Sequence, residues 1–142
     1  MALELFDLGV GVAGEAPRDP DYRWTGMERD DTLVGCACYG PTPGTGGTFD
    51  LYWIAVAAAA RGLGIGRRLL EDVEQMIADE GGRLLVIETS GAPSYEGTRA
   101  FYQNCGYELL ASIRDFYAPG EDRLIFASLP PSAPLAADAT DG

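Results

Sequence analysis

The segment from Arg61 to Gly66 reads RGLGIG and places three glycines at alternate positions between an apolar stretch and a long amphipathic stretch. Backbone N–H groups at the start of a helix point toward a bound anion, and the helix dipole favours negative charge there. Gly62, Gly64 and Gly66 let the backbone approach phosphate oxygens, because they have no Cβ in the way. Arg61 adds positive charge at the rim. The segment is therefore predicted to bind a diphosphate.

Two other interpretations of this turn stay open. The same pattern also suits a tight strand-to-helix connection that binds nothing. Dinucleotide-binding proteins use G-x-G-x-x-G, with an acidic residue about 20 residues later at the end of a strand. Glu88 ends the next expected strand, but the glycine spacing differs and three expected strands precede the turn. Because the dinucleotide fold normally opens with its glycine-rich turn, we favour a different diphosphate cofactor.

The residue types that are missing restrict the chemistry further. The chain has no histidine, and all ten of its basic residues are arginine. A P-loop and a pyridoxal enzyme each need a lysine, and most nucleophilic triads need a histidine base. Histidine-based metal sites are excluded for the same reason, and no metal site is expected. Any general base must therefore be a carboxylate, a tyrosine, a water chain or solvent.

Hydrophobic periodicity predicts one α/β (α+β) domain over residues 1–129, with the element order β-β-β-α-β-α-β-β. Two helices are expected, Gly64–Glu80 and Gly97–Cys105, because apolar residues recur in them at helical spacing. Residues 130–142, rich in proline, alanine and aspartate, are expected to form a disordered tail. The six expected strands are Tyr22–Arg29, Leu33–Tyr39, Thr48–Val56, Arg83–Glu88, Gly106–Arg114 and Arg123–Ser128.

The strand Thr48–Val56 leads into the turn and is mostly apolar on both faces, which is typical of a central strand. The strand–helix–strand unit that starts here requires a right-handed crossover between parallel strands. Strict alternation predicts two faces, one with Asp50, Tyr52, Ile54 and Val56 and the other with Phe49, Leu51, Trp53 and Ala55.

Two motifs, in the expected order, resemble those of the GCN5-related N-acetyltransferase (GNAT) family. RGLGIG matches the family's Q/R-x-x-G-x-G/A motif, and TRAFYQNCGY (residues 98–107) resembles its later helix with an aromatic pair, followed by glycine and an aromatic residue. The resemblance covers roughly residues 22–129 and implies an acyl-CoA N-acyltransferase fold with a mixed, splayed sheet. Residues 1–21 are too short and too rich in glycine and proline for the two helices that usually precede the hairpin, so a shortened N-terminus is expected.

The resemblance implies how acyl-CoA would bind. In this family the strands before and after the first helix separate, and acyl-CoA enters the gap between them. The pantetheine arm would meet the backbone of Ile54, Ala55 and Val56, with the Val56 N–H polarising the acyl carbonyl. The pyrophosphate would be held by Arg61 and by the amides of Gly62, Leu63, Gly64, Ile65, Gly66 and Arg67.

The family reaction is direct attack of an amine on the thioester, so one proton must leave the amine and another must reach the thiolate. Tyr102 matches the family's usual general acid. Because histidine is absent, Glu88 and Asp50 are the candidates for the general base. The alternative for the two carboxylates is a satisfied polar contact, and for Tyr102 a place in the core.

Together these features predict a cytoplasmic N-acetyltransferase that moves an acetyl group from acetyl-CoA to an amine of a small molecule, peptide or protein. The alternative is a non-catalytic acetyl-CoA-binding regulatory module, because the shortened N-terminus leaves the acceptor site without a wall; a homodimer is one way to close it. The net charge of −12 argues against nucleic acid and anionic membrane surfaces as partners. The three cysteines suggest free thiols in a reducing compartment.

Overall fold

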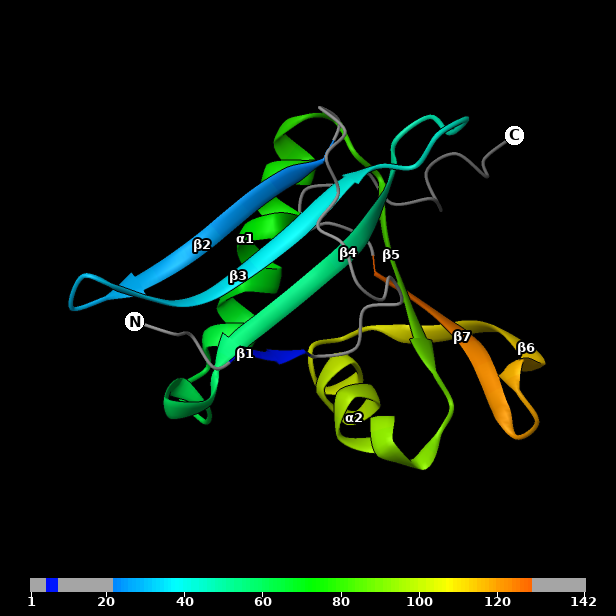
Figure 1. The fold of residues 1–142 in the computed structure, drawn as a ribbon. Helices are drawn as coiled ribbons and strands as arrows, with labels where there is room; N and C mark the ends of the chain where they lie inside the picture. Colours follow the sequence, from blue (N-terminus) through cyan, green and yellow to red (C-terminus); the bar gives the residue numbers. More distant parts are fainter. Residues whose placement is uncertain (1–4, 8–21, 129–142) are drawn as a thin grey trace.

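A mixed sheet and two helices make up residues 5–7 and 22–128, the part of the chain that the computed structural model describes (Figure 1). Each predicted helix and strand is present with small shifts of its ends, and one strand, β1, is an addition. The predicted tail, residues 130–142, lies outside the described residues. The helices are α1 (Ile65–Asp79) and α2 (Glu96–Asn104), each preceded by a short 3-10 turn, η1 (Ala58–Ala60) or η2 (Pro93–Tyr95). The strands are β1 (Leu5–Asp7), β2 (Arg23–Arg29), β3 (Thr32–Pro41), β4 (Thr48–Ala57), β5 (Leu84–Ser90), β6 (Glu108–Ala118) and β7 (Glu121–Ser128).

The sheet has the strand order β2-β3-β4-β5-β7-β6, with β1 paired to β4 outside this path. Among the strand pairs of the described residues, β4 and β5 alone are parallel, because the chain crosses between them through α1. Their pairing is short: it joins Thr48–Leu51 to Leu84–Ile87 and then stops. Beyond Leu51, β4 continues alongside β3 and β1 instead. Strands β4 and β5 therefore separate after Leu51 and Ile87, partway along each strand. This confirms the predicted splayed sheet.

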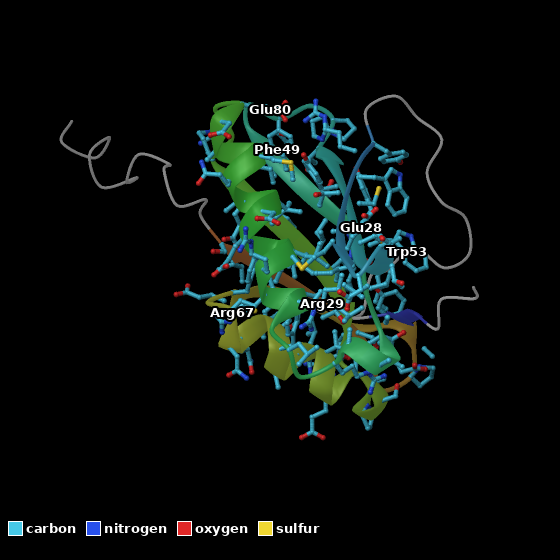
Figure 2. All side chains as sticks on the ribbon, turned by 90° about the vertical axis from the view of Figure 1, so that its left-hand side faces the viewer. Glu28, Arg29, Phe49, Trp53, Arg67 and Glu80 are labelled. Atoms are coloured by element: carbon cyan, nitrogen blue, oxygen red, sulfur yellow. The ribbon has the colours of Figure 1, made fainter. Side chains whose placement is uncertain are left out.

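A β-bulge interrupts β4 at Tyr52. Leu51 lies opposite Tyr39 on β3 and Trp53 lies opposite Cys38, so Tyr52 has no partner on that strand. One extra residue reverses the alternation, since side chains on a strand switch face at each position. The predicted faces are therefore wrong beyond Leu51: Ile54 and Val56 join Phe49 and Leu51 in the core. Figure 2 shows Phe49 on the α1 side of the sheet and Trp53 on the opposite side.

Helix α1 covers one face of β2, β3 and β4 (Figures 1 and 2). Its buried side chains Ile65, Leu69, Leu70, Val73 and Ile77 each stabilise the fold by about 1.5–3 kcal/mol through burial. Gly35 on β3 permits close packing, because a Cβ there would lie 2.9 Å from Leu69 Cδ1. Among residues 5–7 and 22–128, no helix covers the opposite face of these three strands, where Trp24 is 50 % exposed.

Helix α1 is followed by a pair of glycines, Gly81 and Gly82. Gly81 has a φ angle of 80° and donates to the Ala78 carbonyl at 2.9 Å, and Gly82 donates to the Ile77 carbonyl at 2.8 Å. This pair of hydrogen bonds is the Schellman motif, which satisfies carbonyls that the last helical turn leaves free. Gly82 also has no room for a side chain, because a Cβ would lie 2.3 Å from Ile77 Cγ2. The chain is thereby turned back toward the start of β5.

Candidate active site

The turn between β4 and α1 requires glycine at two positions. Gly62 and Gly64 have φ angles of 77° and 76°, a left-handed conformation that costs other residues about 1–2 kcal/mol. A Cβ on either residue would meet nothing within 4 Å, so the requirement is conformational and the space beside both residues is open. Gly64 is the N-cap of α1 and has no side chain with which to cap the helix. The amides at this end are therefore available to a ligand or to water.

The first turn of α1 is positively charged. It contains Arg67 and Arg68 and no acidic residue, an arrangement that the helix dipole disfavours. A helical hydrogen bond runs from the Arg68 N–H to the Gly64 carbonyl at 3.1 Å, and the amides of Ile65, Gly66 and Arg67 precede it without an acceptor inside the helix. A bound diphosphate would provide acceptors for these amides and negative charge beside the arginines.

A cavity of about 330 Å³ lies beside this turn. Val56 from β4 and Ala60 from η1 contribute to its lining, and α2 contributes one wall. Seven of the ten residues predicted to bind the cofactor surround this single cavity. Apart from Val56, they are Arg61, Gly62, Gly64, Ile65, Gly66 and Arg67.

The wall contributed by α2 is the part that sequence reasoning misses. It consists of Phe101, Asn104 and Cys105, whose i, i+3, i+4 spacing places them on one face of the helix. Arg67 donates from Nη2 to the Asn104 carbonyl at 2.5 Å and so joins the start of α1 to the end of α2. The spacing was a signal for a shared face, but it does not tell which face of α2 turns toward α1.

The remaining predicted cofactor residues lie outside the cavity lining. Leu63 is exposed and borders a second cavity, of about 570 Å³, near the end of β2. Ile54 and Ala55 are buried. Strand β1 pairs with β4 at Ala55–Ala57, on the edge opposite β3 (Figure 1). A strand edge accepts one partner at a time, so β1 and a pantetheine arm would compete for these backbone groups.

Tyr102 is 0 % exposed and lies within an aromatic cluster. Its ring centroid is 5.5 Å from that of Phe101, 6.2 Å from that of Tyr107 and 6.4 Å from that of Phe126. Phe101 lines the cavity, so Tyr102 is one residue from the cavity wall along α2. Its place in the core is established, and its role as a general acid stays a prediction.

Asp50 and Glu88 face away from α1 on neighbouring strands. On β4 the flanking residues Phe49 and Leu51 are in the core, and on β5 Leu85 and Ile87 are, so the two carboxylates share the opposite face of the sheet. Asp50 lies opposite Val86, and Glu88 is the first residue of β5 past its pairing with β4. The structure therefore brings these two candidates together at the point where the strands separate.

The partners of these carboxylates were not predicted, because they come from distant segments. Arg123 on β7 forms an ion pair with Glu88, with 2.7 Å between Nη2 and Oε1, and the Tyr117 hydroxyl on β6 donates to Glu88 Oε2 at 2.6 Å. The Thr42 hydroxyl, in the β3–β4 connection, donates to Asp50 Oδ2 at 2.7 Å.

Burial is the main cause of the raised pKa values of Asp50, Tyr52 and Tyr117. It raises the pKa of Asp50, and the Glu88 charge adds to the rise, while hydrogen bonds from Thr42 and Tyr52 and the Arg123 charge oppose it. Burial and the neighbouring Asp50 charge raise the pKa of Tyr52 to about 12. Burial and the hydrogen bond to Glu88 raise the pKa of Tyr117. Both phenols are therefore protonated near neutral pH and act as hydrogen-bond donors.

A model of the acetyltransferase (GNAT) family matches residues 5–107 of the sequence. The chain belongs to the GNAT family. A GNAT-family structure from Desulfovibrio desulfuricans is 45 % identical, covering 77 % of this chain and 69 % of its own, with a TM-score of 0.75. The predictions of the family, of an acetyltransferase and of acetyl-CoA as the family's donor are thus confirmed.

Two more distant GNAT structures share the fold. An aminoglycoside 6'-N-acetyltransferase complexed with coenzyme A is 20 % identical, covers 82 % of this chain and 77 % of its own, and has a TM-score of 0.71. The ribosomal-protein-S18-alanine N-acetyltransferase from Escherichia coli is 20 % identical, covers 84 % of this chain and 76 % of its own, and has a TM-score of 0.68. No curated protein matches the sequence.

The described residues give two further findings about the GNAT chain. Neither helix within residues 22–128 is long and apolar enough to cross a membrane. In the same part of the chain, acidic residues and cysteines do not gather in any group of three or more that could hold a metal ion.

Proposed function

We propose that this GNAT protein transfers an acetyl group from acetyl-CoA to a primary amine by direct attack of the amine on the thioester. The observation that carries the proposal is the cavity between the first turn of α1 and α2, which combines open left-handed glycines, helix amides and two arginines. A diphosphate is the ligand group that matches this combination of donors and charge. Arg61 and the amides from Gly62 to Arg67 would hold it.

The reacting end of the cofactor would lie where β4 leaves β5. There the Val56 N–H would polarise the acyl carbonyl, and the backbone of Ile54, Ala55 and Val56 would contact the pantetheine arm. Tyr102 would return a proton to the departing thiolate, since a phenol of ordinary pKa about 10 can protonate a thiolate whose conjugate acid has a pKa of about 8.5 when the site assists. Asp50 and Glu88, on the face of the sheet opposite α1, are the groups that could accept the amine proton.

The acceptor is proposed to be an amine on a small molecule or on a protein. One structural neighbour is named as acetylating an aminoglycoside and another an alanine of a ribosomal protein, and the amine would approach the face of the sheet that carries Asp50. Thiol release from acetyl-CoA, measured with an aminoglycoside, an alanine-initiated peptide and a lysine peptide, tests the proposal. Binding of coenzyme A without thiol release from any of these amines would contradict it.

The second candidate function is a non-catalytic acetyl-CoA-binding regulatory module. It is favoured by the pairing of β1 with Ala55–Ala57, which occupies part of the edge that pantetheine would need. Calorimetric titration with coenzyme A and with NAD separates both candidates from a dinucleotide-binding protein. A preference for NAD would contradict both.

A further inference from the structure

The two carboxylates at the strand separation differ in how completely they are already bound. Both oxygens of Glu88 have partners: Oε1 meets Arg123 Nη2 at 2.7 Å and Oε2 accepts the Tyr117 hydroxyl at 2.6 Å. These partners lie on β7 and β6, which are paired with each other in an antiparallel ladder. Arg123 is held further by the Phe116 ring, whose centroid is 5.0 Å from its Cζ. Glu88 is thus a carboxylate fixed in place and neutralised by a cation.

Asp50 has a different set of contacts. Its Oδ2 accepts the Thr42 hydroxyl, and the Tyr52 hydroxyl also favours its charged form. Both donors are neutral, and none of the ion pairs within residues 22–128 includes Asp50. Its side chain is half-buried beside Glu88, and Arg123 is the weakest of the influences on it. Two carboxylates therefore share one arginine, and the excess negative charge belongs to Asp50.

We propose that Asp50 is the general base and that Glu88 is a positioning residue, held in place by Arg123 and Tyr117. This assignment rests on the proposed function. An acceptor ammonium on this face of the sheet would compensate the excess negative charge beside Asp50. The ammonium first loses one proton to an Asp50 oxygen, and the freed nitrogen lone pair forms the bond to the acyl carbon. As the carbon–sulfur bond breaks, the nitrogen loses a second proton to water and becomes the amide nitrogen, while the departing thiolate takes a proton from Tyr102 or water.

A carboxylate already bound to a guanidinium and a phenol is a poor base, because protonation would break both charge-assisted contacts. A carboxylate with neutral donors and no cation loses less on protonation, and burial beside a second anion raises its pKa. The groups that act on Asp50 are Thr42, Tyr52, Glu88 and Arg123, from four separate segments. Glu88 therefore influences the reaction through its charge on Asp50 and does not receive the proton itself.

The test is the pH dependence of kcat/KM for an accepted alkylamine in three variants. Asp50→Asn is expected to lower kcat/KM about a hundredfold or more, as loss of a general base does, and to remove the acidic limb that Asp50 causes. Glu88→Gln is expected to keep that limb and move it to lower pH, because an anion beside Asp50 is lost. Arg123→Gln is expected to move it to higher pH, because a cation is lost, and Arg123→Lys is expected to leave it near its original position.

Two controls separate proton removal from misfolding. Hydroxylamine, whose ammonium form is far more acidic than an alkylammonium, needs little base, so Asp50→Asn is expected to retain most of its turnover with this acceptor. Asp79→Asn removes a carboxylate that accepts a hydrogen bond from Gln75, at the far end of α1, and is expected to change neither rate nor profile. Equal losses with both acceptors in Asp50→Asn would overturn the assignment, and so would loss of the limb in Glu88→Gln.

A measurement without turnover distinguishes failure of this assignment from failure of the proposed function. Carbon-13 NMR titration of the Asp50 carboxyl in the free protein is expected to give a raised pKa that falls in Glu88→Gln and rises in Arg123→Gln. An Asp50 pKa that is not raised, or that does not respond to either variant, overturns the assignment even if amines are acetylated. The expected titration without thiol release from any amine would leave the charge arrangement intact and contradict the transferase function itself.

Discussion

Replacing Gly64 with alanine gives the sharpest test of the diphosphate site. Gly64 has a φ angle of 76°, and a Cβ there would meet nothing within 4 Å. The stability cost is therefore the backbone term alone, about 1–2 kcal/mol for a left-handed alanine. Alanine also restricts the unfolded chain, which offsets about 0.4–1 kcal/mol of this cost. The net loss of about 1 kcal/mol should lower Tm by about 2–4 °C for a chain of this size.

The effect of Gly64→Ala on the cofactor should be larger than its effect on stability. The added methyl group projects into the open space at the start of α1, where phosphate oxygens would approach the amides. Loss of one hydrogen bond to a charged group costs about 1.5–3 kcal/mol, which corresponds to a roughly tenfold to hundredfold weaker affinity for coenzyme A. Isothermal titration calorimetry with coenzyme A measures this change directly.

Gly120→Ala is the matched control. Gly120 has a φ angle of 81° in the β6–β7 turn, and its Cβ would also meet nothing within 4 Å. The Tm of the Gly120→Ala variant should therefore fall by a similar amount, while its affinity for coenzyme A should equal that of the wild type. Equal affinities in the Gly64 and Gly120 variants would refute the argument that the α1 turn holds the diphosphate.

Three further predictions concern other parts of the site and the core. Tyr102→Phe should lower kcat without weakening coenzyme A binding, as stopped-flow thiol release and calorimetry would show; an unchanged kcat would assign Tyr102 to the core alone. Burial raises the pKa of Glu74, which accepts a hydrogen bond from Tyr107. The Glu74 carboxyl therefore binds a proton more tightly in the folded state than in the unfolded state. As a result, the free energy of unfolding falls as pH rises from the unfolded pKa of Glu74 through its folded pKa. Thermal melts should therefore show Glu74→Gln gaining on the wild type as pH rises, and a constant difference would contradict this sign. Deleting residues 1–7 removes β1 and should lower KM for acetyl-CoA by freeing the edge at Ala55–Ala57; a higher KM would mean that β1 supports the site.

The sequence by itself located the turn that is proposed to hold the cofactor, because that part of the candidate site is local. The RGLGIG turn, the first turn of α1 and the glycine pair at its end depend on backbone conformation and on the order of neighbouring residues. Gly62 and Gly64 need a left-handed backbone, and Gly81 and Gly82 terminate the helix through bonds within six residues. Each of these features involves groups close in the chain, and sequence spacing describes such groups directly.

The tertiary structure alone decided the faces of β4 and the roles open to the two carboxylates. The bulge at Tyr52 reflects how β4 meets β3, and periodicity within one strand carries no information about an extra residue. Asp50 and Glu88 were both found as candidates, but Arg123, whose ion pair with Glu88 distinguishes them, lies on the separate strand β7. Proton affinity depends on burial and on charges brought near by folding, and these contacts exist only once the sheet has formed.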